Sequence, residues 1–163
     1  MAKTNIGKKW EDKFKLGWTL CFPKPRGWIF RLKDNMNHFK DTSGNPCDFL
    51  CHLDDYLFMV ECKEHKGMSI PFKAIPQYDR LLEHEHYNHV YPGVLIWFSE
   101  KDTVIWVNIY EMEKMVKDGE KSIGLRMLKE GKYKIVVLPC EVKRTYPVVD
   151  YNYLIQEEIN YER

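Results

Sequence analysis

The chain has 163 residues, 44% of them hydrophobic and 14% aromatic, which suits a single folded domain with a substantial core. No stretch approaches the roughly eighteen consecutive apolar residues of a membrane-spanning helix, so a membrane partner is excluded. The polar start, Met1 to Asn5, lacks the apolar run of a secretory signal, so we expect a cytoplasmic protein. The five cysteines are odd in number and lie mostly in apolar runs, which favours buried thiols over disulfides.

The net charge is only +1, but its distribution along the chain is uneven. Residues 1–40 carry ten lysines or arginines against three acids, so the remainder of the chain is acidic. Such an asymmetry can place a basic face for phosphates on a nearly neutral protein. A solvated helix face explains the same charges, and charge alone does not separate the two interpretations.

The first forty-six residues predict a helix followed by a projecting arm. Ile6, Trp10 and Phe14 recur every four positions between Asn5 and Leu16, which is typical of an amphipathic helix. The segment Pro23–Pro46 mixes prolines, glycines, basic residues and aromatic rings, and we expect it to project as a loop or irregular hairpin. Its rings fit either stacking on bases within a phosphate-binding arm or a small local core.

The rest of the chain predicts alternating strands and helices. Two apolar runs, Cys47–Leu53 and Tyr56–Cys62, flank Asp54-Asp55 and indicate a β-hairpin. Further expected elements are a helix from Pro71 to Asn88, strands Gly93–Phe98 and Val104–Ile109, short helices Met112–Lys117 and Ile123–Lys129, a strand Ile135–Leu138 and an acidic, tyrosine-rich tail. We interpret the tail acids Glu157, Glu158 and Glu162 as a solvated helix face.

This order predicts one α/β domain built around a mixed β-sheet that helices flank. The strand segments are continuously apolar rather than alternating, which indicates parallel strands buried on both faces.

The hairpin brings three charged residues together. If Asp54-Asp55 is a two-residue turn, residues whose numbers sum to 109 face each other across the strands, and Asp48 and Glu61 form such a pair. Lys63 projects from the same face, two positions beyond Glu61.

Two opposed carboxylates in an apolar hairpin repel each other and are costly to desolvate, so a compensating charge is expected. Carboxylate oxygens are the ligands that Mg²⁺ prefers, and Mn²⁺ is a possible substitute. A metal beside Lys63 and a basic segment favours metal-assisted hydrolysis of phosphodiesters. A solvent-exposed sheet edge with a Glu–Lys pair is the alternative.

Zinc or cysteine chemistry is a weaker interpretation. Cys47, Cys51 and His52 lie close in sequence, as do three histidines at positions 84, 86 and 89, but no CxxC pair is present. Buried thiols and a polar helix end explain these residues more simply.

Asp48, Glu61-Cys62-Lys63 and the preceding helix that bears Glu11 resemble the core of PD-(D/E)xK nucleases. More narrowly, the chain is similar to RecU-type Holliday-junction resolvases in four stretches: Glu61 to Glu64, Ser69-Ile70-Pro71-Phe72, Pro92-Gly93-Val94 and Ser122-Ile123. The resemblance implies a restriction-endonuclease-like fold and a homodimer that nicks four-way DNA junctions with Mg²⁺.

The same resemblance implies roles for particular residues. Asp48, Glu61 and the Cys62 carbonyl would hold the metal, and Lys63 would position the attacking water. Glu11 would bind a second metal or a water, and Gln77 would lie beside the site, although the interval from Ser69 to Gln77 is shorter than in the family. Arg31 would be the functional arginine of the arm. The remaining expected DNA contacts are Lys8, Lys9, Lys24, Arg26, Trp28, Lys33 and Ser69.

Two other functions remain open at this point. One is a restriction- or repair-type endonuclease of the same superfamily that acts on duplex DNA. The other is a catalytically silent DNA-binding module, which would have no chemical need to keep Asp48, Glu61 and Lys63 together among apolar neighbours.

Overall fold

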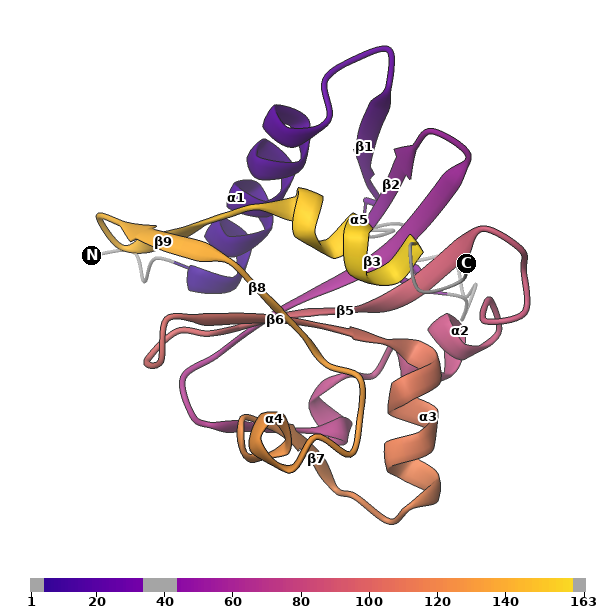
Figure 1. Ribbon diagram of the computed structural model, residues 1–163, viewed down its shortest axis with the longest axis vertical. Coiled ribbons are helices and arrows are strands. Elements are labelled where there is room, and N and C mark those ends of the chain that lie inside the picture. Colours follow the sequence, from indigo (N-terminus) through magenta and orange to yellow (C-terminus); the bar gives the residue numbers. More distant parts are fainter. Residues whose placement is uncertain (1–4, 34–43, 160–163) are drawn as a thin grey trace.

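A mixed sheet of six strands runs through the centre of the protein (Figure 1). We describe a computed structural model, in which residues 5–33 and 44–159 are placed. The strands of the central sheet are β1 (Gly27–Arg31), β2 (Phe49–Leu53), β3 (Tyr56–His65), β5 (Val90–Phe98), β6 (Thr103–Asn108) and β8 (Val136–Leu138). They lie in the order β1-β2-β3-β5-β6-β8, so β1 and β8 form the two edges.

Helices cover both faces of this sheet. Figure 1 shows α1 (Ile6–Cys21) and α5 (Tyr151–Ile159) on one side, and α2 (Tyr78–Leu82), α3 (Ile109–Lys117) and α4 (Arg126–Glu130) on the other. The smaller elements are β4 (Ser69–Pro71), a 3₁₀ turn at Phe72–Ala74, β7 (Ser122–Gly124), β9 (Cys140–Lys143) and β10 (Tyr146–Val149). No helix in the described residues is long and apolar enough to cross a membrane.

The β2–β3 hairpin has the register predicted from the sequence. Its pairs run from Phe49 opposite Val60 to Leu53 opposite Tyr56, with Asp54 in the left-handed conformation that a tight turn requires. The expected parallel pairing is confirmed for one pair, β3 with β5 from Leu57–Val90 to His65–Phe98, whereas the other neighbours in the central sheet pair antiparallel. Alternation along β3 then sends Phe58, Val60 and Cys62 into the core under α1 and α5.

The opposite face of β3 carries Met59 into the second core, where it packs with residues of β5, β6 and α3. Glu61 follows Met59 by two positions and therefore projects from this same face. Gly93 on the neighbouring strand allows a close approach of Trp106, since a Cβ at this position would lie 2.5 Å from the Trp106 ring. The strand that carries Glu61 is thus held inside a tightly packed sheet.

The predicted arm is the largest departure from the sequence analysis. Gly27–Arg31 form β1, which pairs antiparallel with β2 along its whole length, instead of projecting from the domain. Ile29 contributes to the core beneath α1, and this burial holds the strand on the sheet edge. Residues 34–43 of the predicted arm, including Phe39 and Lys40, lie outside the described residues.

Three other elements differ in extent. The predicted helix from Pro71 to Asn88 is reduced to the 3₁₀ turn and the five residues of α2, and its first residue, Pro71, pairs with β7 instead. The predicted helix Ile123–Lys129 is divided between β7 and α4, because Ile123 and Gly124 pair with β4. The C-terminal tail forms α5, whose Tyr151 and Leu154 are buried against the sheet.

Candidate active site

Asp48 is tied to the strand that carries Glu61. It directly precedes β2, and its Oδ2 accepts a hydrogen bond from the Cys62 main-chain N–H at 2.8 Å. Its own N–H donates to the Val60 carbonyl at 3.1 Å, so the regular ladder ends at Phe49 and Asp48 is offset from the expected pairing with Glu61. The Asp48 carboxylate nevertheless lies close enough to Glu61 for its negative charge to raise the pKa of Glu61.

Glu61 is a buried carboxylate with incomplete compensation. The residue is 1% exposed, and its Oε1 lies 2.8 Å from the Lys63 ammonium. Its Oε2 is buried and has no hydrogen-bond partner among the described residues. Burial, and secondly the charge of Asp48, raise the pKa of Glu61 to about 7 despite Lys63. A bound cation would give Glu61 Oε2 a partner and would compensate the negative charges of Asp48 and Glu61.

Glu11 and Arg31 complete the cluster from two other elements. Glu11 projects from α1 and forms an ion pair with Arg31 at the end of β1. Burial and the charge of Asp48 raise the pKa of Glu11, and Arg31 lowers it. Four successive segments of the chain, namely α1, β1, the start of β2 and β3, therefore bring together three carboxylates, one lysine and one arginine. Arg31 was expected on a projecting arm, but it lies beside the carboxylates instead.

The donor set fits a hard divalent cation. Asp48 and Glu61 offer carboxylate oxygens, excess negative charge and the orphaned Oε2. No group of three or more His, Cys, Asp or Glu side chains in the described chain is arranged to hold a metal, so main-chain oxygen and water would complete the coordination. Burial raises the pKa of the Cys47 thiol to about 12, and burial also raises that of Cys62, so both are protonated thiols in the metal-free protein.

Two further predicted site residues lie on neighbouring elements. Ser69 begins β4, and its hydroxyl donates to the Ser122 hydroxyl at 2.6 Å, which joins β4 to β7. Gln77 directly precedes α2, and its Oε1 is buried without a partner among the described residues. The roles of Ser69 and Gln77 at the candidate active site stay predictions.

The predicted DNA contacts are spread over the molecule. Lys8 and Lys9 are exposed on the first turns of α1, the helix that bears Glu11. Arg26 pairs with Asp54 at 3.1 Å, at the end of the β2–β3 hairpin remote from Asp48. The other three contacts are an exposed Lys24 in the turn after α1, Trp28 stacked on His52 with ring centroids 5.4 Å apart, and Lys33, whose carbonyl accepts from Asn45.

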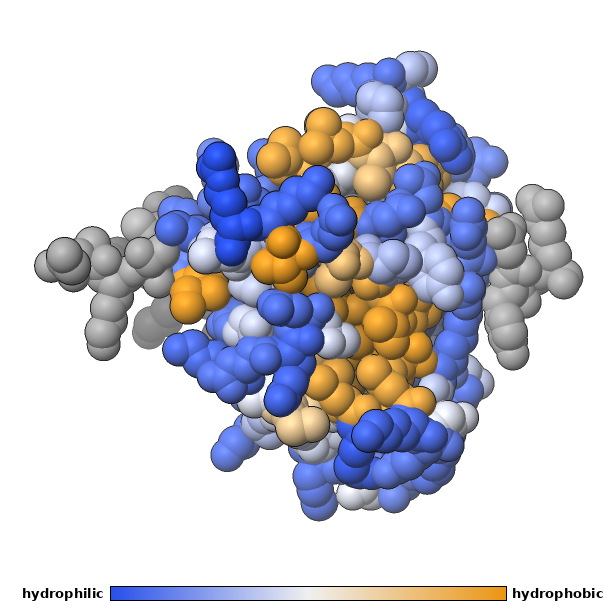
Figure 2. Space-filling model, turned by 60° about the vertical axis from the view of Figure 1, so that its left-hand side comes forward, coloured by the Kyte–Doolittle hydropathy of each residue, from blue (hydrophilic) through white to orange (hydrophobic). Residues whose placement is uncertain are grey.

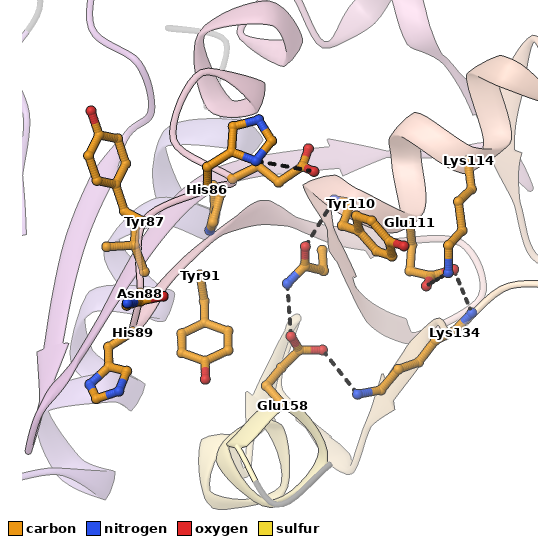
Figure 3. Close-up of a pocket in the computed structure, with 14 residues that line it drawn as sticks. His86, Tyr87, Asn88, His89, Tyr91, Tyr110, Glu111, Lys114, Lys134 and Glu158 are labelled. Carbon is orange, nitrogen blue, oxygen red and sulfur yellow. Dashed lines mark hydrogen bonds and ion pairs between the residues drawn. The ribbon is translucent and has the colours of Figure 1, made fainter. Parts of the chain in front are cut away.

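A second polar cluster, which was not predicted from the sequence, lines a pocket (Figure 3). Glu158 was expected on a solvated face, but it is 6% exposed and accepts a hydrogen bond from Asn108 at 3.0 Å. Its spacing could have indicated this burial, because Tyr151, Leu154 and Glu158 follow one another at helical intervals on the face turned toward the sheet.

Comparisons with known proteins add a relationship at the level of fold. No protein-family model matches the chain, and no curated protein matches its sequence. Among solved structures, it is similar to Hjc, a Holliday junction resolvase from the archaeal hyperthermophile Archaeoglobus fulgidus. The TM-score is 0.54 at 13% sequence identity, over 76% of this chain and 93% of the resolvase. The chain has the fold of this resolvase. The predicted α/β architecture, a mixed sheet flanked by helices, is thereby confirmed.

Proposed function

We propose that this protein is a Mg²⁺-dependent endonuclease that cleaves four-way DNA junctions. The observation that carries the proposal is the buried Glu61 beside Asp48, with one orphaned oxygen and one oxygen on Lys63. The resolvase fold supports it, because this cluster lies on a sheet of the same architecture. The RecU-type assignment within the PD-(D/E)xK nucleases rests on the sequence motifs alone.

The residues of the cluster divide the work of phosphodiester hydrolysis. Asp48, Glu61 and the Cys62 carbonyl would hold the divalent ion, which supplies positive charge against the scissile phosphate. The Lys63 ammonium, now on Glu61 Oε1, is placed to orient the attacking water and to stabilise negative charge on the phosphate. Glu11 would hold a second ion or a water, and its ion pair with Arg31 keeps it near Asp48.

The direct test compares a labelled four-way junction with a linear duplex of the same sequence, in Mg²⁺ and in chelator. We expect paired, symmetric nicks in the junction in Mg²⁺ and none in chelator, with Mn²⁺ restoring cleavage. Cleavage that continues in chelator would contradict the metal site. If neither substrate is cleaved, the remaining candidate is a catalytically silent DNA-binding module. A gel-shift assay with the same two substrates would then detect its DNA binding.

A duplex-specific endonuclease of the same superfamily is the second candidate. It is favoured by one observation: the predicted arm supplies the edge strand β1 of the sheet, so its described part does not project toward a junction. Equal cleavage of junction and linear duplex would select this candidate over the first.

Arg31 should contribute to junction processing without supporting the fold. The Arg31→Ala variant removes the ion pair with Glu11 and the positive charge nearest to it, and the side chain is 38% exposed, so little core packing is lost. We expect cleavage of the junction to fall about tenfold to a hundredfold, with an unchanged circular-dichroism spectrum. Arg144→Ala, which removes an exposed arginine of the β9–β10 turn, is the charge-matched control. Unchanged cleavage in Arg31→Ala would remove Arg31 from the mechanism.

A homodimer is part of the proposal, because a four-way junction presents two strands for paired nicks. Exposed hydrophobic side chains lie on the side that carries α1 and β10, which pack together; they include Leu16, Leu20 and Val148. Figure 2 brings this side forward and shows hydrophobic surface bordered by hydrophilic residues. We expect a second copy to cover this surface.

The dimer surface is tested with a single charge. Leu20 is 71% exposed on α1, so Leu20→Glu should leave the fold intact and weaken self-association at least about tenfold. Sedimentation velocity over a concentration series measures this effect. Val116→Glu makes the same change at a side chain 42% exposed on α3 and serves as the control. A wild-type dimer that Leu20→Glu leaves unchanged would exclude this surface as the interface.

A further inference from the structure

A pocket lies at the end of the sheet where β5 begins and β6 ends. Its volume is about 650 Å³, and residues of the loop before β5, of α3 and of α5 line it (Figure 3). Tyr91 of this pocket pairs with Phe58 in the sheet, three residues before Glu61 on β3. Phe58 and Tyr91 face the core under α1 and α5, whereas Glu61 projects from the opposite face of the sheet, so the pocket is distinct from the candidate active site.

Tyrosine rings form much of the wall. Tyr87, in the loop before β5, and Tyr110, on α3, are 62% and 49% exposed, while Tyr91 is buried at 5%. Figure 3 shows Tyr91 in the middle of the lining, Tyr110 to one side of it, and the Tyr87 ring turned away from both. The Lys114 ammonium lies 4.5 Å from the centre of the Tyr110 ring and covers one face of it, so the other face of this exposed ring is the one on which a planar ligand can stack.

The floor presents fixed hydrogen-bonding groups. Glu158 is 6% exposed, and its two oxygens face Asn108 at 3.0 Å and the Lys134 ammonium at 3.7 Å. Lys134 is itself fixed by a hydrogen bond to the Glu157 carbonyl at 2.6 Å. A carboxylate oxygen has two lone pairs, so Glu158 retains capacity to accept N–H groups from a ligand.

The charges of the pocket disfavour a phosphate. The Lys114 ammonium lies 2.7 Å from Glu111, and Lys134 lies beside Glu158, so both lysines are matched by carboxylates. Glu85 adds a third acid to the lining, which leaves an excess of negative charge when the histidines are neutral. A neutral, planar ligand with N–H donors on its edge fits this combination, and nucleobases have these properties.

We propose that this pocket binds an unpaired nucleobase, stacked on Tyr110 with its N–H edge toward Glu158 and Asn108. That the base belongs to a DNA strand bound for cleavage rests on the proposed function, whereas binding of the base itself does not. Bases with an amino group, namely guanine, adenine and cytosine, bind more tightly than thymine, because an exocyclic amine donates to the carboxylate.

The test measures nucleoside binding to the whole protein in chelator, so that metal and cleavage play no part. Deoxyguanosine, deoxyadenosine, deoxycytidine and thymidine are titrated in turn, with binding followed by amide NMR shifts. We expect shifts at residues of the pocket, with thymidine the weakest ligand. Tyr110→Ala should weaken binding at least about tenfold, the loss expected for one stacking ring. Tyr153→Ala, at a tyrosine of α5 that is 37% exposed and outside the pocket lining, should bind as the wild type does.

Two further variants separate this inference from the proposed nuclease. Glu158→Gln should abolish the preference for amino-bearing bases, and Asp48→Asn should bind nucleosides like the wild type. Saturable binding that Tyr110→Ala does not weaken, or no binding of any of the four nucleosides, would overturn the pocket. Nucleoside binding by a protein that cleaves no DNA would leave the pocket standing and contradict only the nuclease.

Discussion

Replacing Asp48 with asparagine is expected to lower Mg²⁺-dependent cleavage of four-way junctions by about 10³-fold, a loss comparable with removing a main electrostatic group from an active site. The substitution removes one of the two charges that would hold the cation beside Glu61 Oε2. Asparagine can still accept the hydrogen bond that Asp48 takes from the Cys62 N–H at 2.8 Å, so the local backbone should be preserved.

The measurement is a single-turnover cleavage rate, accompanied by calorimetric titration with Mn²⁺. Both the rate and the metal affinity should fall in Asp48→Asn, because the metal and the chemistry share this carboxylate. Asp55→Asn makes the same substitution in the exposed turn at the other end of the hairpin and should cleave at the wild-type rate. Metal-dependent cleavage that survives intact in Asp48→Asn would show that the catalytic site lies elsewhere.

Replacing Glu61 with glutamine is expected to stabilise the metal-free protein while abolishing cleavage. The folded pKa of Glu61 is raised from 4.5 to about 7 by burial and by Asp48, so the folded state favours the protonated, neutral form. The stability that this preference provides is fully present below pH 4.5 and is lost as the pH rises through about 7. At pH 8 ionised Glu61 therefore costs the fold up to about 3 kcal/mol, which the neutral amide avoids.

Urea unfolding in chelator at pH 8 and pH 5 measures this effect. We expect Glu61→Gln to raise the free energy of unfolding at pH 8 by up to about 3 kcal/mol and to change it much less at pH 5. Glu64→Gln provides a control on the same strand, because Glu64 lies three positions from Glu61 and is half-buried beside Ser99. A variant that is less stable than the wild type at pH 8 would mean that Glu61 is better compensated than its buried setting indicates.

In saturating Mg²⁺ at pH 8, the wild type should become more stable than Glu61→Gln, the reverse of the order expected in chelator. Bound cation compensates ionised Glu61 in the folded state, and a ligand that binds only the folded protein adds stability with its concentration. The wild type should gain stability in Mg²⁺ at pH 8, and Glu61→Gln should gain little. This comparison links the buried carboxylate to the metal without relying on any DNA substrate.

The β2–β3 hairpin could be predicted because its information is local. The side chains of a strand alternate with a period of two, and a two-residue turn sets the register of its strands, so Glu61 and Lys63 could be placed on one face from residue spacing. The one local error, the offset of Asp48, arises where the ladder ends and its N–H bonds to Val60 rather than continuing the pairing.

Features that depend on contacts between distant segments could not be predicted in this way. Residues 23–46 have the composition of a loop, yet Gly27–Arg31 become a sheet edge because β2 offers a free edge and the partly buried Ile29 packs against the core beneath α1. Glu158 has the sequence context of an acidic tail, yet the packing of α5 buries it beside Asn108. In both cases burial against a partner outweighs the local preference.

Asp48, Glu61 and Lys63 were therefore determined as a group by the sequence itself, because one hairpin contains all three. The ion pair of Glu11 with Arg31 and the tyrosine-lined pocket were decided only by the tertiary structure. They join segments that are far apart in the chain, and only the packing of helices on both faces of the sheet brings those segments together. The hairpin supplies the proposed metal ligands, and the packing around it sets their burial and hence the raised pKa of Glu61.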